Sequence, residues 1–214
     1  MSRVVPEEMM RINCGIEEYQ NQKERQKRRL YLTRRISSLD YDEDNYFEFN
    51  SVVGQIILDI LEYNREDEGK PIEERVPIKL FINSPGGEVV EGFPLISTIE
   101  LSKTPVHVFN IGEWSSMSFL IGITGHKRFA LPYTTFLLHD GSTVSWNSTS
   151  KAIDKAKFDE RFERDVVKAH VLKHSEMTSA EYDGLVRVEY YMLPEDALHH
   201  GFIDKIVTSI EDII

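Results

Sequence analysis

Gly112-Glu113-Trp114-Ser115-Ser116-Met117 lies where a strand pattern changes into a helix pattern. The apolar run Val106–Ile111 before it is typical of a buried strand, and helical character begins at about Ser115. Backbone N–H groups at the start of a helix have no intrahelical partner and carry the positive end of the helix dipole. A serine at this position can either cap the helix or attack a carbonyl carbon while the N–H groups hold the resulting oxyanion.

The order of strand, turn and helix recurs along the chain and predicts an α/β fold. Ile78–Ile82 has the composition of a buried strand, Asn83–Gly87 supplies turn residues, and apolar side chains in Val89–Ile99 follow at helical spacing. Such units imply parallel strands joined by crossover helices. Further strands are expected at 30–33, 129–132, 135–139 and 202–207, and further helices at 49–63, 151–173, 178–184 and 194–200.

Composition and charge exclude several classes of protein. The chain has 214 residues, of which 41% are hydrophobic, a net charge of −11 and one cysteine, Cys14. The negative charge argues against a nucleic-acid partner, and the basic residues between positions 23 and 35 are interpreted as solvated surface. No apolar run is long enough for a membrane span, and one cysteine leaves no disulfide framework or cysteine-rich zinc site. The N-terminus lacks an apolar secretory stretch, so we expect a cytoplasmic protein.

His139 is the candidate base for a serine nucleophile, because histidine accepts protons near neutral pH. It follows the apolar residues 136–138 and precedes the turn Asp140-Gly141. In a parallel sheet this position lies at the carboxyl end of a strand, where sites collect. On these residues alone, a structural role for the histidine and a capping role for the serine both stay open.

Five blocks of sequence occur in order between about Leu30 and Val207. They are Ile82–Gly87, Gly112–Met117, Lys127–Pro132, Leu138–His139 and Pro194–Ile206. In this combination they resemble the proteolytic subunit of the Clp protease, a serine-peptidase family. The five ordered blocks are far more specific than any one of them, and they span most of the chain.

The resemblance implies a crotonase-like, Clp-type α/β core and a serine peptidase site. Ser116 matches the nucleophile, His139 matches the general base, and the backbone N–H groups of Gly87 and Met117 match the oxyanion hole. Expected partners are peptide or unfolded protein substrates, further copies of the chain in stacked heptameric rings (a tetradecamer), and an ATP-driven AAA+ unfoldase. No metal or organic cofactor is implied. The expected organisation is an N-terminal arm at 1–28, a peptidase domain at 29–210 and a tail at 211–214.

Two departures from the family pattern concern the third triad residue and the surroundings of the site. The family has an aspartate shortly before the block that begins at Pro194, and alignment places Glu189 there, with Asp183 as the alternative. A glutamate keeps the charge that orients the imidazole but moves the carboxylate by one methylene. The family's glycine-rich segment after the histidine is replaced by 141–147, and Trp114, where a small residue is usual, is expected to crowd the site. These substitutions indicate a divergent member with altered specificity or regulation.

The helix expected at Lys151–Lys173 has a narrow apolar stripe and packs either on its own domain or on another subunit. The resemblance favours a subunit interface, because the helix matches the handle that joins two rings. Trp114 and Glu189 support a rival interpretation, in which the chain is an inactive structural subunit that co-assembles with an active paralogue. A second rival keeps the fold but acts on acyl-thioesters, and the pairing of Ser116 with His139 argues against it.

Overall fold

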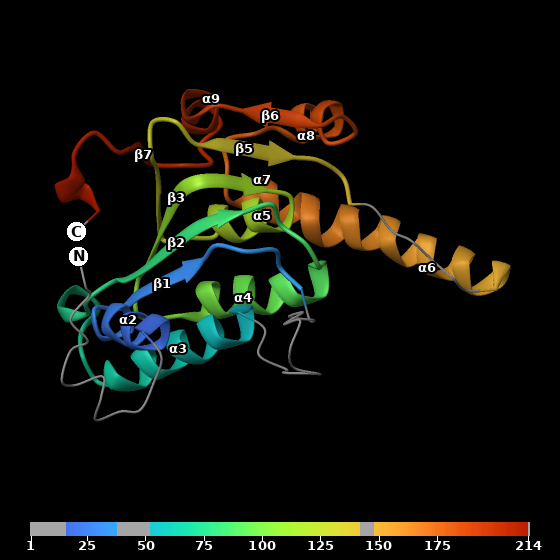
Figure 1. Cartoon of the computed structure of the whole chain (residues 1–214). Coiled ribbons are helices and arrows are strands. Elements are labelled where there is room, and N and C mark those ends of the chain that lie inside the picture. The colour runs from blue at the N-terminus through green and yellow to red at the C-terminus, as the bar shows by residue number, and fades with distance from the viewer. Residues whose placement is uncertain (1–15, 38–51, 142–147, 214) are drawn as a thin grey trace.

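The structure is a computed structural model that describes residues 16–37, 52–141 and 148–213 (Figure 1). The strands are β1 (Arg29–Leu32), β2 (Ile78–Ser84), β3 (Val106–Ser115), β4 (Lys127–Ala130), β5 (Thr135–Leu138), β6 (Tyr190–Met192) and β7 (Lys205–Ile206). The α-helices are α2 (Ile16–Gln26), α3 (Val52–Glu66), α4 (Val89–Leu101), α5 (Met117–Ile123), α6 (Thr149–Phe162), α7 (Lys168–Lys173), α8 (Ser179–Leu185) and α9 (Pro194–His199). A π-helical segment, η2 (Glu163–Val167), joins α6 to α7, and η1 (Ile72–Glu74) and η3 (Ile210–Asp212) are 3₁₀ turns.

The sheet confirms the predicted α/β class and is parallel along the order β1-β2-β3-β4-β7. The long strand β3 pairs with β4 along its first half and with β5 along its second half. Buried Asn110 lies where the two pairings part: its side-chain N–H donates to the carbonyl of Thr135 at 3.0 Å, and its side-chain oxygen accepts from the N–H of Gly112 at 3.0 Å. β5 continues into an antiparallel pairing with β6.

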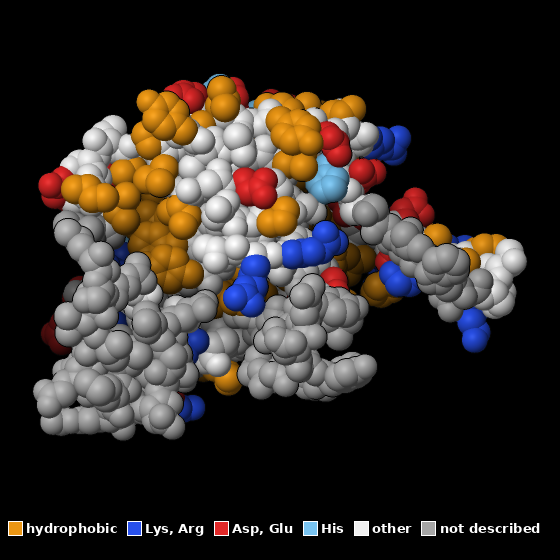
Figure 2. Space-filling model, in the orientation of Figure 1, with side chains coloured by type: hydrophobic (Ala, Val, Ile, Leu, Met, Phe, Trp, Pro, Cys, Tyr) orange, Lys and Arg blue, Asp and Glu red, His pale blue; other side chains and the backbone are white. Residues whose placement is uncertain are grey.

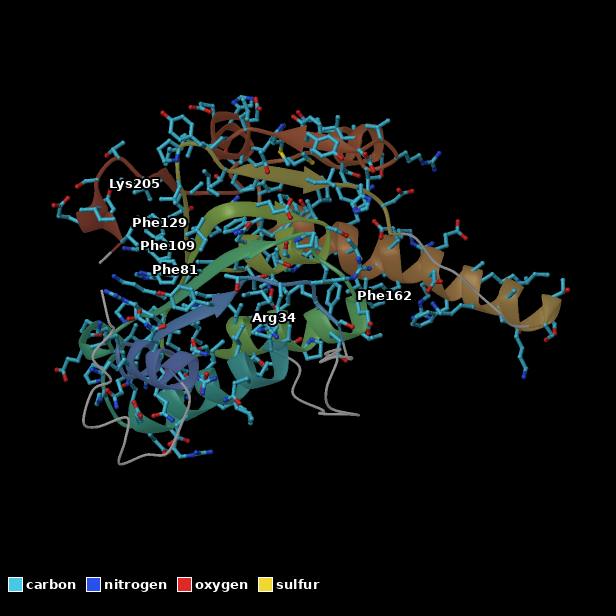
Figure 3. The ribbon with its side chains drawn as sticks, viewed as in Figure 1. Arg34, Phe81, Phe109, Phe129, Phe162 and Lys205 are labelled. Carbon is cyan, nitrogen blue, oxygen red and sulfur yellow. The ribbon has the colours of Figure 1, made fainter. Side chains whose placement is uncertain are left out.

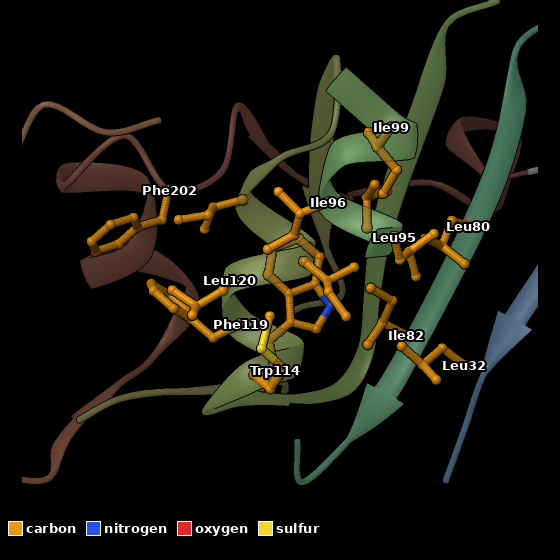
Figure 4. Close-up of a cluster of buried hydrophobic side chains, with 14 of the residues drawn as sticks. Leu32, Leu80, Ile82, Leu95, Ile96, Ile99, Trp114, Phe119, Leu120 and Phe202 are labelled. Atoms are coloured by element: carbon orange, nitrogen blue, oxygen red, sulfur yellow. The ribbon is translucent and has the colours of Figure 1, made fainter. Parts of the chain in front are cut away.

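The core lies between the sheet and the helices that cover it. Figure 1 shows α3 and α4 along one face of the sheet, and Figure 4 shows the side chains that fill the space between strands and helices. Alternate residues of the strands point into this layer because successive side chains of a strand face opposite sides. The residues labelled there are Leu32, Leu80, Ile82, Leu95, Ile96, Ile99, Trp114, Phe119, Leu120 and Phe202, all of them buried.

The opposite face of the sheet carries a row of aromatic rings across β1 to β4. Tyr31, Phe81, Phe109 and Phe129 stack in sequence with centroid separations of 5.1, 5.0 and 4.7 Å. Figure 3 labels three of these rings side by side, and Figure 2 shows hydrophobic side chains gathered in the same part of the view.

The helix predicted at 151–173 is present from α6 to α7, and it contains the π-helical segment that periodicity did not indicate. Its first half extends away from the rest of the molecule (Figure 1). Phe162, at the base of the projection, meets Phe93 edge-on with ring centroids 5.2 Å apart (Figure 3). Farther out, Ile153 and Phe158 are 50% and 58% exposed.

The basic segment at 23–35 is only partly the solvated surface that its charge suggested. The side chain of Arg28 is 11% exposed and forms a two-pronged ion pair with Asp67, which is 1% exposed. Thr104 and Lys70 also donate to this carboxylate, at 3.0 and 2.7 Å. These donors hold the pKa of Asp67 well below its usual range. Cys14 and most of the segment at 141–147 lie outside the described residues.

Candidate active site

Ser116 occupies a sharp turn between the end of β3 and the start of α5. Its backbone has φ 56 and ψ −124, a conformation that residues other than glycine rarely adopt. Its N–H donates to the carbonyl of Leu137 on β5 at 3.0 Å, which fixes the turn against the neighbouring strand. The Ser116 side chain forms no capping hydrogen bond, so the alternative role as a helix cap is not realised. Ser116 is therefore a partly exposed residue on a strained backbone, an arrangement that clusters at functional sites.

The loop Gly86-Gly87 packs directly against this turn. Gly86 has φ +85, and a Cβ there would lie 2.4 Å from the carbonyl oxygen of Ser115 and 2.9 Å from Cβ of Ser116. The backbone on both sides of Gly87 bonds to Ile36: Ile36 N–H donates to Gly86 O at 2.8 Å, and Glu88 N–H donates to Ile36 O at 2.9 Å. In a parallel pairing of this kind the intervening residue directs its own N–H to the opposite side. The N–H of Gly87 thus points away from Ile36.

A buried network of serine hydroxyls ties the glycine loop to the serine turn. Ser118 Oγ accepts from the N–H of Ser115 at 2.9 Å and donates to the carbonyl of Ser84 at 2.6 Å. Ser84 Oγ in turn accepts from the N–H of Gly86 at 3.2 Å and donates to the carbonyl of Arg34 at 2.7 Å. Sequence reasoning missed both serines. The available signal was Ser118, a lone hydroxyl inside the apolar run of α5, all of which is buried.

His139 follows β5 at the same sheet edge as the serine turn. Ser115 pairs with Leu137 in the parallel ladder of β3 and β5, so both strands deliver the residues after them to one edge. The Nε2 atom of His139 is buried and has no hydrogen-bond partner among the described residues. Consequently no hydrogen bond joins it to Ser116 in this single chain. A buried nitrogen without a partner is unusual, and a catalytic role is one of the explanations it calls for.

The two candidate carboxylates have different relations to His139. In the antiparallel ladder of β5 and β6, Leu138 pairs with Tyr190, and the same register continued by one residue sets His139 opposite Glu189. The Glu189 carboxylate is exposed and accepts from the hydroxyl of Tyr191 at 2.9 Å. Asp183, on α8, pairs with Lys168 at 2.6 Å.

Trp114 does not crowd the site, contrary to the expectation from sequence. Its ring is fully buried in the core, edge-on to Phe136 with centroids 5.4 Å apart (Figure 4). A Cβ at Gly122 would lie 2.4 Å from this ring, so the small residue accommodates the tryptophan. Position 114 shares the helix-facing side of β3 with Val106 and Val108, all of them buried. The chain leaves the strand at the turn of Ser116, so the ring and the hydroxyl point to different places.

Metal-binding capacity lies elsewhere in the chain. Among the described residues, the one group of three His, Cys, Asp or Glu side chains close enough to share an ion is Glu100, His170 and His174. This group includes none of the candidate site residues. Within the described ranges, no helix combines the length and apolar character needed to cross a membrane.

Comparisons with known proteins find two matches to this chain. A family model described as Clp protease matches residues 49–210. The ATP-dependent Clp protease proteolytic subunit of Deinococcus radiodurans is 31% identical to this chain over 165 residues, which cover 76% of each protein. The region matched by the family model contains every candidate site residue.

Proposed function

This chain belongs to the Clp protease family, and we propose that it is a serine endopeptidase with Ser116 as its nucleophile. The observation that carries the proposal is the left-handed backbone of Ser116, held between β5 and the Gly86-Gly87 loop without any capping role for the hydroxyl. A strained backbone at this position is explained if it directs the hydroxyl of Ser116 toward a substrate carbonyl. The family match favours peptide bonds over acyl-thioesters as the target.

In the proposed mechanism His139 Nε2 removes the proton from Ser116 Oγ as the oxygen attacks the peptide carbonyl carbon. The negative charge that develops on the carbonyl oxygen is stabilised by the N–H groups of Gly87 and Met117. The C–N bond breaks, the protonated His139 gives its proton to the departing amine, and an acyl-enzyme ester is left on Ser116. His139 then takes a proton from water as the water oxygen attacks the ester carbon. The bond between this carbon and Ser116 Oγ breaks, His139 returns the proton to Oγ, and the acid product is released.

Glu189 is the proposed third member of the triad, since the register of β5 and β6 favours it over Asp183. A carboxylate opposite His139 fixes the tautomer that keeps Nε2 free to accept and stabilises the imidazolium. The longer side chain has to reach across the antiparallel pair, and the hydroxyl of Tyr191 restrains it at 2.9 Å.

We further propose that the site becomes complete in an assembly of several copies. His139 Nε2 has no partner among the described residues, so the hydrogen bond from Ser116 must close when substrate or a neighbouring chain binds. Stacked heptameric rings, peptides or unfolded proteins as substrates, an AAA+ unfoldase as the partner and a cytoplasmic location all belong to this proposal.

A second candidate function is that of a structural subunit without activity of its own. Two observations favour it: the absence of a bond from Ser116 to His139 and the engagement of Glu189 by Tyr191. Under this alternative the chain assembles with an active paralogue and supplies ring structure.

Labelling of the purified protein with a fluorophosphonate separates the two candidates. We expect wild type to be labelled and Ser116→Ala to be unlabelled, because the probe reacts with an activated serine hydroxyl. His139→Ala is expected to lower the labelling rate by about 100-fold or more, the usual contribution of a general base. A wild-type assembly that takes up no label, while remaining folded, contradicts the peptidase proposal and supports the structural subunit.

A further inference from the structure

A compact cluster of side chains is formed by Glu100, His170 and His174, and the proposed peptide hydrolysis uses none of them. Glu100 lies near the end of α4, His170 lies on α7, and His174 is the C-cap residue that follows α7. The N–H of His174 donates to the carbonyl of His170 at 3.2 Å, so the two histidines lie one helical turn apart on the same side. One ligand atom from each residue lies within 4.8 Å of the other two. Glu100 Oε1 is 2.9 Å from His174 Nε2 and 3.9 Å from His170 Nδ1.

The hydrogen bonds of His170 set its ring in the orientation that a metal ligand needs. Its Nε2 lies 3.0 Å from the backbone carbonyl oxygen of Leu120 and 3.3 Å from the hydroxyl of Thr124. A carbonyl oxygen can only accept, so Nε2 carries the proton and Nδ1 is left with a free lone pair directed to the cluster. Metal-binding histidines in proteins typically donate their second N–H to a carbonyl in this way.

We propose that Glu100, His170 and His174 bind a divalent transition-metal ion, with zinc as the expected ion. Two imidazoles and one carboxylate are a known zinc donor set, and the fourth tetrahedral position then belongs to water. With bonds of about 2.0–2.1 Å, tetrahedral zinc separates its ligand atoms by about 3.3 Å. The two distances of 2.9 and 3.9 Å lie on either side of this value, and the two imidazole nitrogens lie within 4.8 Å of each other, so the three side chains have to draw together around the ion.

Solvent approaches the cluster from the side of His174. This histidine and the neighbouring Lys173 line a pocket of about 520 Å³. Lys173 donates to Glu100 at 2.7 Å, but its side chain is 62% exposed and can turn into solvent when an ion takes over the carboxylate. The nearby Arg128 is held by Asp204 and by the carbonyl of His174.

Binding at this position joins three helices of the molecule. The ion connects the end of α4 to α7, the segment from which the projecting helix emerges. Through His170 the same ion connects to the carbonyl of Leu120 on α5, and Leu120 N–H bonds to the carbonyl of Ser116 at 3.3 Å. The proposed ion is therefore a structural clamp at the base of the long helix, and its existence does not depend on peptidase activity.

The test is a zinc titration of the full chain, without an affinity tag and with Cys14→Ser to remove the one thiol. A chromophoric chelator competes for zinc, and cobalt as a substitute ion reports ligand geometry by its visible absorption. We expect one ion per chain, a cobalt spectrum typical of tetrahedral sites, and a rise in Tm with zinc. His174→Gln and Glu100→Gln each remove a ligand on a partly exposed side chain, and each is expected to weaken binding by about 100-fold or more.

His199→Gln is the matched control, since this exposed histidine lies outside the cluster and its loss should leave zinc affinity unchanged. Circular dichroism of each variant checks that the chain is folded. Zinc affinity that is equal in wild type, His174→Gln and Glu100→Gln overturns the proposal. So does a folded wild-type chain that binds neither zinc nor cobalt in the competition assay.

Discussion

At the scale of single residues, the candidate site depends on two backbone conformations with positive φ that face each other. Ser116 has φ 56 and Gly86 has φ +85, and the closest approach between their segments leaves no space for a side chain at 86. Ser84 and Ser118 lock this contact with buried hydrogen bonds. The position of the hydroxyl is thus set by backbone contacts more than by its own side chain.

Gly86→Ala is predicted to damage the site more than the fold. The added Cβ would lie 2.4 Å from Ser115 O, and the alanine would have to keep the left-handed backbone of Gly86. We expect the free energy of unfolding to fall by about 1–3 kcal/mol. Because the loop must shift away from Ser116, fluorophosphonate labelling should fall by about 10-fold or more, as small displacements of catalytic groups cost activity steeply. Denaturant unfolding and labelling kinetics measure the two effects.

Gly184→Ala is the matched control. Gly184 lies inside α8 with no atom near its would-be Cβ, so alanine should stabilise the helix by about 0.5–1 kcal/mol and leave labelling unchanged. Equal labelling of wild type and Gly86→Ala would show that the glycine loop does not position the serine.

Glu189→Gln and Asp183→Asn discriminate between the two candidate carboxylates. We expect Glu189→Gln to lower the rate of hydrolysis or labelling by about 100-fold to 10⁴-fold, since an amide favours the wrong imidazole tautomer. Asp183→Asn removes only a pair with Lys168 on an exposed side chain, so its rate should stay near wild type. The reverse order of effects would assign the role to Asp183, and two unchanged rates would leave the site without a working carboxylate.

At the scale of elements, the sequence was sufficient wherever a segment carried its own periodicity. The units at 78–99 and 106–123 are strands followed by helices as predicted, and the capping box at Thr178 opens α8. The short strand β6 was missed, because three residues show no alternation and its pairing with β5 defines it. The π-helical segment and the ion pair of Arg28 with Asp67 were also missed, since both depend on tertiary contacts.

In the candidate site, too, local motifs were predictable from the sequence and features set by tertiary contacts were not. Ser116, His139, Gly87 and Met117 were proposed from local motifs and the family resemblance, and their roles stay predictions. The helper residues Ser84 and Ser118 could not be found by periodicity, because their function is to join two segments that are distant in sequence. The facing direction of Trp114 was misjudged for a related reason: the register of β3 determines it.

His107, on strand β3, makes the free energy of unfolding of the protein depend on pH. It lies on β3 directly between Lys79 of β2 and Lys127 of β4 in the ladder. Burial, and then the charges of Lys127, His126 and Lys79, lower the pKa of His107 from 6.5 to about 4. As pH falls from 6.5 to 4, the unfolded chain gains a proton at this position that the folded chain refuses, so the free energy of unfolding decreases over this window.

His107→Gln is therefore predicted to flatten this part of the pH dependence, with the largest gain over wild type near pH 4. Urea unfolding of both proteins between pH 4 and pH 7 measures the difference. His199→Gln, which removes an exposed histidine, should follow the wild-type curve. A wild-type and a His107→Gln curve that run parallel across the window would mean that His107 titrates normally.

At the scale of the whole molecule, the projecting helix is the part least explained by the single chain. α6 has 14 residues and no buried one, whereas isolated helices shorter than about 12–15 residues are marginal in water. Ile153 and Phe158 expose half or more of their side chains along it. Figure 2 shows hydrophobic side chains on this projection. A helix of this kind is stabilised by packing its apolar stripe on a partner, and the proposed partner is another copy of the chain.

Phe158→Glu is predicted to break this association, because it places an unpaired charge where the apolar ring would be buried. We expect wild type to elute as a large assembly in size-exclusion chromatography with light scattering, and the variant to elute as smaller species with association weakened by at least about 30-fold (about 2 kcal/mol), as for a buried aromatic hot spot. Lys157→Gln is the matched control: it makes the same change in net charge at the neighbouring exposed position. Two outcomes would contradict this prediction: an assembly unaffected by Phe158→Glu, or one disrupted equally by Lys157→Gln. Either would show that the ring of Phe158 is not buried between copies and that the exposed apolar stripe of α6 has another cause.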